Sequence, residues 1–172
     1  TSASAAECQD PLLVQPFAPR GDLRDYVMVP GGDFADASGW QLSRGAKIVD
    51  AEQADGTSGG VLELPSGAVA VSPTVCVDIN YPTARLHSRS VRGGGFVAVA
   101  VAYQDRRTQY RQQLVDVLRS RSSDWKLSRD IRIQPQLAGR EAGWRRVAFV
   151  FVAAGRSSAH QVDDLYVDPR MS

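Results

Sequence analysis

The sequence lacks most of the residues and patterns on which common enzyme activities depend. It has only two cysteines and two histidines in 172 residues, and two widely separated cysteines do not form a four-ligand zinc site by themselves. It contains no Cys-x-x-Cys redox pair, no His-Glu-x-x-His zinc motif and no phosphate-binding loop. No apolar run approaches the length of a membrane-spanning helix. We therefore expect no catalytic residues. A pair of glycosidase carboxylates is the enzyme alternative that stays open, because neighbours in space are invisible in a sequence.

The two cysteines, Cys8 and Cys76, are expected to form a single disulfide that ties an N-terminal arm to a core strand. Closing so long a loop contributes on the order of 4 kcal/mol in the chain-entropy model. A disulfide would place the protein outside the reducing cytosol. The small residues of Thr1–Glu7 resemble the tail left around a signal-peptide cleavage site, which favours a secreted protein. The alternative is a pair of free thiols in a cytosolic protein.

Glycine and proline are spread evenly along the chain. The 15 Gly and 9 Pro separate short Val-rich runs, which is typical of an all-β fold. Strand signals at this spacing predict a jelly-roll β-sandwich of two antiparallel sheets. Residues 1–25 contain Pro11, Pro16 and Pro19, so we expect an extended N-terminal arm there. Residues 26–172 are expected to form one sandwich domain.

Three segments give specific strand predictions. Phe96–Tyr103 and Trp144–Val152 are apolar on both faces, which predicts central strands. Residues 108–120 fit both helical and strand spacing, and the strand is favoured because its neighbours are strands. Pro65–Gly67 separates two apolar runs and predicts a hairpin.

The closing strand is expected over His160–Pro169, with an irregularity inside it. If Val162 faces the core, strict alternation would turn Leu165 to the opposite face together with Asp163. A bulge near Asp163 and Asp164 is therefore predicted. Adjacent carboxylates repel each other, so a cation or nearby hydrogen-bond donors should relieve the pair.

Charge is distributed unequally between the two halves of the chain. Residues 1–80 hold four basic and eleven acidic side chains, and residues 81–172 hold sixteen and eight, so the halves carry about −7 and +8. This pattern fits a basic surface for an acidic polymer, or head-to-tail contacts between copies. The simpler interpretation is that a sandwich interleaves both halves and largely cancels the asymmetry.

Two segments carry a resemblance to known proteins. Gly31–Trp40, with its Gly-Gly-Asp-Phe start and Gly-Trp end, and the Val-Asp-Asp-Leu-x-Val stretch of 162–167 resemble jelly-roll carbohydrate-binding modules and their galactose-binding-like relatives. With Leu64–Gly67, Ser72–Pro73 and Cys76–Asp78, the chain also resembles uncharacterised secreted actinobacterial proteins, which supply no activity to carry over.

The resemblance also implies a structural calcium. In the carbohydrate-binding relatives, oxygen ligands of the first strand meet a carboxylate of the last, and the matching positions here are Gly31, Asp33 and Asp163. The chain departs from the pattern at Ala35, where the family has Glu, and Asp36 stands one position later. The alternative is that the aspartates accept hydrogen bonds from backbone donors near a strand bulge.

Tyr103, Arg106 and Tyr110 are the expected ligand contacts, because they combine flat rings with a polar fork at the mouth of a hairpin. The three tryptophans start strands and are expected in the core rather than against a sugar; they are Trp40, Trp125 and Trp144.

Arginine clusters can contact phosphates or uronates, although an Arg-rich composition explains them more simply; the clusters are Arg85, Arg89 and Arg92, Arg106, Arg107 and Arg111, and Arg119 and Arg121.

The sequence favours a secreted, non-catalytic module that binds a glycan or cell-envelope polymer. The alternative is a structural protein whose copies assemble through the N-terminal arm and complementary charged faces. Nucleic acid is not an expected partner, because no interleaved aromatic RNA-binding motif is present.

Overall fold

A computed structural model describes residues 12–78, 83–104, 109–133 and 144–168, without the side chains of Asp78, Trp144 and Arg145. Every extended element in these ranges is a β-strand. The strands are β1 (Val27–Met28), β2 (Gln41–Ser43), β3 (Lys47–Glu52), β4 (Ser58–Pro65), β5 (Val69–Val71), β6 (Val75–Asp78), β7 (Thr83–Arg92), β8 (Phe96–Gln104), β9 (Tyr110–Leu118), β10 (Lys126–Leu127), β11 (Ile131–Arg132), β12 (Trp144–Ala154) and β13 (Ala159–Asp168).

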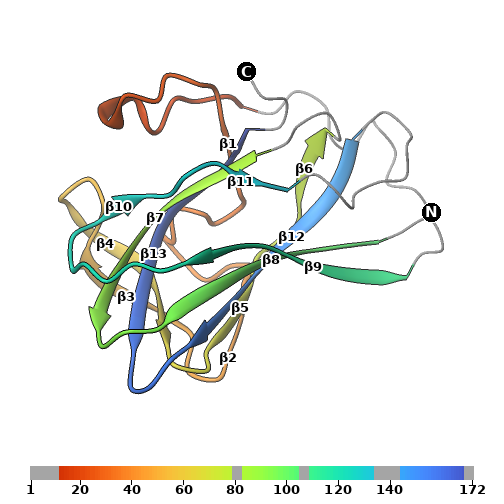
Figure 1. Cartoon of the computed structure of the whole chain (residues 1–172). Helices are drawn as coiled ribbons and strands as arrows, with labels where there is room; N and C mark the ends of the chain where they lie inside the picture. The colour runs from red at the N-terminus through yellow and green to blue at the C-terminus, as the bar shows by residue number, and fades with distance from the viewer. Residues whose placement is uncertain (1–11, 79–82, 105–108, 134–143, 169–172) are drawn as a thin grey trace.

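The strands form two antiparallel sheets packed as layers (Figure 1). The seven-stranded sheet runs β10-β7-β13-β4-β3, with β1 also paired to β13 and β11 to β7. The six-stranded sheet runs β2-β5-β12-β8-β9, with β6 also paired to β12. The predicted all-β jelly-roll sandwich is confirmed. Each sheet draws strands from both halves of the chain, so the acidic and basic halves are interleaved as the simpler interpretation of the charge pattern expected.

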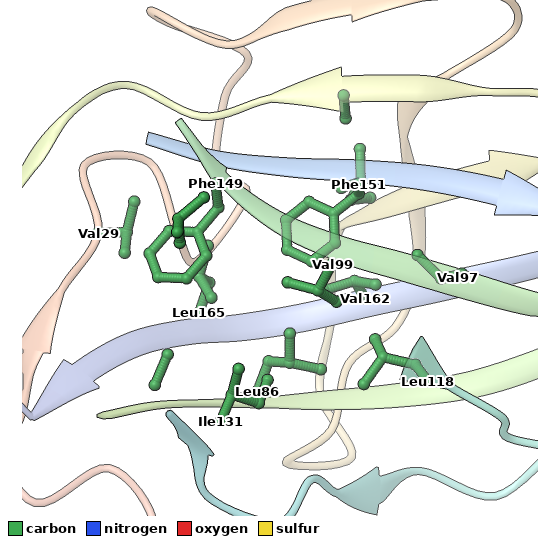
Figure 2. Close-up of a cluster of buried hydrophobic side chains, with 14 of the residues drawn as sticks. Val29, Leu86, Val97, Val99, Leu118, Ile131, Phe149, Phe151, Val162 and Leu165 are labelled. Atoms are coloured by element: carbon green, nitrogen blue, oxygen red, sulfur yellow. The ribbon is translucent and has the colours of Figure 1, made fainter. Parts of the chain in front are cut away.

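The core lies between the two sheets. Phe149 and Phe151 of β12 point across the gap toward Val162 and Leu165 of β13 and Leu86 of β7 (Figure 2). All five side chains are 0% exposed. Alternation on β8 places its three valines in the core and its alanines on the opposite face, as strand geometry requires. This burial of apolar surface from both layers is the main source of stability.

Three strand predictions made from the pattern of apolar residues are confirmed. Residues 110–118 form β9, which confirms the strand interpretation of the ambiguous segment. β8 lies between β12 and β9, and β12 lies between β5 and β8, so both predicted central strands are confirmed.

The predicted hairpin at Pro65–Gly67 is wrong. β4 pairs with β13 and β3 in one sheet, whereas β5 pairs with β12 and β2 in the other. The turn is local, since the Ala68 N–H donates to the Pro65 carbonyl at 2.9 Å, but the Gly67 N–H donates to Ala153 of β12 at 2.8 Å. The turn therefore carries the chain from one layer to the other. Turn residues specify a reversal but not which sheet receives the next strand.

The described part of the N-terminal arm folds back onto the seven-stranded sheet (Figure 1). It contains a 3₁₀ turn at Ala18–Arg20 and one bridge between Val14 and Tyr26. Phe17 is 0% exposed and meets the ring of Tyr26 edge-on, with centroids 5.1 Å apart. The arm thus contributes an aromatic side chain that closes the outer face of the sheet.

Charged groups also hold the arm in place. The carboxylate of Asp22, whose side chain is 8% exposed, accepts hydrogen bonds from Arg85 of β7 at 2.6 Å and from the Tyr26 hydroxyl at 2.6 Å. Arg24 bridges Asp22 and Asp130, at 2.9 and 2.7 Å. The Arg24 hydrogen bond is the largest cause that lowers the pKa of Asp22 below its usual range. The ion pairs Asp22–Arg85 and Arg24–Asp130 join the two halves of the chain.

Cys8 lies outside the described residues, so the disulfide between Cys8 and Cys76 stays a prediction. Cys76 stands in β6, opposite Arg146 of β12, and the described residues include no free cysteine. None of the described residues forms a helix with the length and apolar character needed to span a membrane.

Candidate ligand-binding cleft

The ladder between β8 and β9 separates the two tyrosines that were predicted to share a ligand. Tyr103 packs against the core, whereas Tyr110 is 79% exposed. The register pairs Tyr103 with Arg111 and Gln104 with Tyr110, and neighbouring residues of a strand point to opposite faces. The two rings therefore lie on opposite faces of the sheet. Arg106 lies outside the described residues. The structure therefore does not bring Tyr103 and Tyr110 together, and the contact predicted for Arg106 stays a prediction.

The predicted bulge in β13 is confirmed. The register of β13 against β7 shifts between Asp163 and Tyr166, and Asp164 takes a left-handed conformation with φ of 54°. The extra residue restores the phase of the strand, so Val162 and Leu165 both face the core. The alternation of apolar and polar residues in the sequence is therefore interrupted at the same place as the regular backbone of β13.

The same bulge determines the surroundings of Asp163, which is 2% exposed. One carboxylate oxygen accepts a hydrogen bond from the Asp164 N–H at 2.9 Å, and the other accepts one from the Ala54 N–H at 3.1 Å. Burial, together with the nearby charge of Asp164, raises the pKa of Asp163 to about 6. These contacts match the alternative to calcium, in which the carboxylate accepts hydrogen bonds from backbone donors at a bulge.

The residues predicted to bind calcium do not form an acidic cluster. Asp33 accepts a hydrogen bond from the Ala35 N–H at 3.2 Å within its own loop, which also contains Gly31. Among the described residues, no group of three or more His, Cys, Asp or Glu side chains is arranged to hold a metal ion. Calcium favours six to eight oxygen ligands with several carboxylates. The side chains present here fit that requirement poorly, and no step below depends on calcium.

A buried histidine accompanies the bulge. His87 of β7 is 5% exposed, its Nδ1 lies 3.1 Å from a carboxylate oxygen of Asp164, and its ring packs edge-on against Phe17 of the arm at 5.4 Å. The arm covers the His87 ring, whereas the Asp164 side chain keeps 30% exposure. The buried groups at the bulge hold the arm and the closing strand together.

One hydrolase-like sequence pattern does not form the corresponding structure. Gly56–Gly60 reads Gly-x-Ser-x-Gly, which in hydrolases presents a nucleophilic serine between a strand and a helix. Here it connects β3 to β4, which pair antiparallel, and the exposed Ser58 begins β4. No helix follows, so the segment is a hairpin turn rather than a nucleophile elbow.

An open cleft of about 590 Å³ lies where the edges of the two sheets approach each other. One wall is the end of β9, the floor is the segment that follows it, and the other wall is β10 with Ser128 and Arg129. The Ser90 N–H of β7 donates to the Ser122 carbonyl at 2.8 Å, which ties this connecting segment to the seven-stranded sheet. A second hollow of about 490 Å³ continues along β9 and shares Asp116 and Arg129 with the first.

The lining of the cleft combines apolar side chains, from Val117, Leu118 and Leu127, with polar ones, and its charged groups are mostly basic. It contains four cationic side chains, four serines and one carboxylate, and it contains no aromatic ring; the residues are Arg119, Arg121, Lys126 and Arg129, Ser88, Ser120, Ser122 and Ser128, and Asp116. Guanidinium groups and hydroxyls are donors that suit the oxygens of sugars and carboxylates.

Asp116 is held inside the cleft by the register of β9. It stands opposite Val99, a core residue of β8, so its side chain turns inward and is only 4% exposed. Both of its oxygens accept hydrogen bonds from Arg129, at 2.5 and 3.3 Å. The Arg129 side chain is 79% exposed, and its pKa is raised by the Asp116 hydrogen bond. This pair is neutral overall and fixes one end of the cleft.

The other three cations of the cleft have no counter-charge. Among the described residues, no carboxylate lies within 4.0 Å of Arg119, Arg121 or Lys126, and all three residues are exposed. The Arg119 guanidinium lies 5.5 Å from the centre of the Phe96 ring, which restricts its position. The cleft therefore carries a net positive charge of about three, counting Asp116 against Arg129.

Sequence reasoning identified only part of this cleft. Arg119 and Arg121 stood in a noted arginine cluster, but Lys126 and Arg129 belong to a segment that reaches the same site through the pairing of β10 with β7. That pairing leaves no local signal in the sequence.

Trp40 packs in the core, as expected, and Trp125 is buried outside the core cluster between the sheets. Trp40 and Trp125 are each 7% exposed. The Trp125 Nε1–H donates to the Glu52 carbonyl at 3.0 Å, and Arg89 stacks 4.5 Å above its ring centre. The Trp144 side chain lies outside the described part of the chain. Neither of the two described tryptophans offers a face to the cleft.

Comparison with known proteins identifies the fold of the chain but does not assign the chain to a family. No protein-family model matches the chain, and no curated protein matches it significantly. Solved structures do match in fold. The CBM22-1 xylan-binding domain of Paenibacillus barcinonensis Xyn10C is 11% identical with a TM-score of 0.56, and the match covers 82% of this chain and 94% of that domain.

Two further structures agree. TmCBM61, solved with β-1,4-galactotriose, is 18% identical with a TM-score of 0.51, over 86% of this chain and 99% of the other. The CBM22-1–GH10 modules of Clostridium thermocellum xylanase Xyn10B, solved with xylohexaose, are 13% identical with a TM-score of 0.61, over 79% of this chain and 27% of the other. At these identities the likeness shows a shared fold: this chain folds as a jelly-roll sandwich similar to carbohydrate-binding modules.

Proposed function

We propose that this chain is a secreted, non-catalytic module that binds a glycan or cell-envelope polymer in the cleft beside β9. The observation that carries the proposal is the open cleft between β9 and β10, whose lining includes four serines and four cationic side chains. The fold supports it, because the similar structures include domains named for xylan binding or solved with an oligosaccharide. A cleft open along its length suits a polymer better than a small enclosed ligand.

A non-catalytic role agrees with how the acidic and histidine side chains are arranged. Asp163 is buried at the bulge, Asp164 lies beside the buried His87, and Asp116 is engaged by Arg129. A glycosidase needs two carboxylates that face one sugar from an accessible site. In the described residues, the cleft has one carboxylate in its lining. The proposal therefore assigns binding rather than hydrolysis to this cleft.

Assembly through the N-terminal arm has weaker support. The described part of the arm packs onto its own chain through Phe17 and through the Asp22 ion pairs. An arm engaged in this way is not free to join a second copy. Exposed Leu12 and Leu23, at 81% and 68%, are the features that would favour self-association.

The proposed extracellular location depends on the predicted disulfide of Cys8 and Cys76, and counting thiols in the purified protein with and without reductant tests it. The calcium prediction for Gly31, Asp33 and Asp163 has its own test. Comparing the melting temperature in excess calcium with that in chelator would show a calcium-dependent rise if the ion binds.

The binding proposal is tested by affinity electrophoresis through gels that contain xylan, galactan, polygalacturonate or extracted envelope polysaccharide. The S120W variant should fill the cleft and abolish retardation. The matched control is S43W, because Ser43 and Ser120 each make one weak hydrogen bond of 3.4 Å to a carbonyl and Ser43 lies outside the cleft. Equal binding by S120W would remove the cleft from the proposal. Failure of the wild-type protein to bind any of these polymers would contradict the function itself.

A further inference from the structure

The chemistry of the cleft is unusual for a site that binds neutral sugars. Neutral glycans are commonly bound by aromatic side chains that stack on the apolar face of the sugar ring. The described lining of this cleft includes no Phe, Tyr or Trp, and Trp125 beside it is buried. Besides the aliphatic side chains of Val117, Leu118 and Leu127, the lining offers a ligand hydrogen bonds and charge.

The charges are arranged so that they remain available to a ligand. Arg129, which Asp116 neutralises, is the one cation of the cleft with a carboxylate partner within the described chain. Arg119, Arg121 and Lys126 are exposed to solvent. Three neighbouring cations repel one another, so an anionic ligand that binds among them relieves that repulsion.

The cations lie on two of the elements that line the cleft. Arg119 and Arg121 lie on the segment that crosses between the sheets, and Lys126 lies on β10 on the opposite wall. The second hollow extends the same surface along β9 past Arg119. The cations are therefore distributed along the cleft, where a polymer with one negative charge at each repeat would place several anionic groups.

We propose that the cleft selects an acidic polysaccharide, whose repeating carboxylates are bound by Arg119, Arg121 and Lys126 while its hydroxyls meet the serines of the lining. The inference rests on the proposed glycan-binding function and adds the class of glycan. Guanidinium groups bind carboxylates through paired N–H donors, which gives Arg119 and Arg121 the main part in selection.

The test measures binding of polygalacturonate and of its fully methyl-esterified form, which has the same backbone without charge. We expect the wild-type protein to bind the acidic polymer at least tenfold more tightly, and to lose most of that affinity between 50 mM and 500 mM salt because exposed charges are screened. Dextran sulfate is included to distinguish carboxylate from sulfate as the preferred anion. Single-stranded DNA tests for a general polyanion surface.

The variant that tests the residues is R119Q/R121Q/K126Q. The control is R20Q/R44Q/R156Q, which changes the net charge equally at exposed positions outside the cleft lining. Each exposed ionic contact is worth a few tenths to about 1 kcal/mol, so losing three should weaken binding roughly tenfold, and the control should change it less than twofold.

The outcomes distinguish failure of the acidic-polysaccharide proposal from failure of the proposed glycan-binding function. Equal binding of the acidic and esterified polymers, or an unchanged affinity of the cleft variant, would overturn the inference while leaving glycan binding intact. Tighter binding of DNA than of polygalacturonate would also overturn it. A wild-type protein that binds no polysaccharide, charged or neutral, would end both proposals.

Discussion

The charged groups beneath the N-terminal arm and those of the cleft serve the molecule in opposite ways. At the arm, Asp22 and Asp163 are buried and each accepts several hydrogen bonds from its own chain. In the cleft, Arg119, Arg121 and Lys126 face solvent without a carboxylate partner in the described residues. The charged carboxylate of Asp22 contributes to stability, the buried carboxylate of Asp163 costs stability when it ionises, and exposed unpaired charges contribute little. The comparison shows that the charges of the arm are used within the fold, whereas the three cations of the cleft remain accessible to a ligand.

The largest expected effect comes from removing the aromatic anchor of the arm. F17A should lower the free energy of unfolding by about 3–4 kcal/mol, because a fully buried phenylalanine leaves a cavity. Urea denaturation measures the change. The control is L12A, at a side chain that is 81% exposed, which should change stability by less than about 0.5 kcal/mol. Equal, small effects of both variants would show that the arm is not docked.

The second prediction uses the raised pKa of Asp163. The folded carboxyl has a pKa of about 6 against 3.8 in the unfolded chain, so the folded state binds the extra proton between these values. Its ionisation costs the folded protein on the order of 3 kcal/mol as the pH rises from below 4 to above 6. D163N lacks this titration, so its stability relative to the wild type should improve by up to that amount over the same range. Urea denaturation at pH 4 and pH 8 measures it, and a constant difference would contradict the assignment.

The third prediction concerns Asp22, whose pKa is lowered in the folded state. Here the sign is reversed: the ionised carboxylate stabilises the fold above about pH 4, and this contribution is lost as the pH falls through the lowered pKa. D22N should reduce stability at pH 7 by about 2 kcal/mol, since the partner arginines are partly solvated. The difference from wild type should shrink in acid. A difference that grows at low pH would show that the carboxylate is not the stabilising form.

The smallest effect is expected in the cleft. R119Q/R121Q/K126Q should change the free energy of unfolding by less than about 0.5 kcal/mol, because the three cations are exposed and form no ion pair in the described chain. Melting temperatures of this variant and of wild type decide the point. A loss greater than about 1.5 kcal/mol would mean that the cleft charges are structural, and the comparison between the two regions would fail.

The sequence predicted features that follow from burial along one strand. The phase break at Asp163 and Asp164 located the bulge, and the apolar faces of β8 and β12 placed them inside their sheet. Features that depend on the pairing register between strands could not be predicted from the sequence. Tyr103 and Tyr110 are close in sequence, but the ladder between β8 and β9 turns them to opposite faces.

The cleft was inaccessible to sequence reasoning for the same reason. Its two walls belong to different sheets, and only the pairing of β10 with β7 brings Lys126 opposite the end of β9. The turn after β4 shows the limit most directly, because the same Pro-Ser-Gly signal fits a hairpin and a passage between layers.

The irregular register of β9 has a consequence for how molecules of this protein meet in solution. β9 is the last strand of its sheet in the described chain, and its pairing with β8 shifts between Val99 and Ala100. Free strand borders readily recruit strands from other chains, and a kinked border offers them a poorly matched row of amide groups. The register shift next to Asp116 thus also discourages fibre-like stacking of neighbouring protein molecules along this edge.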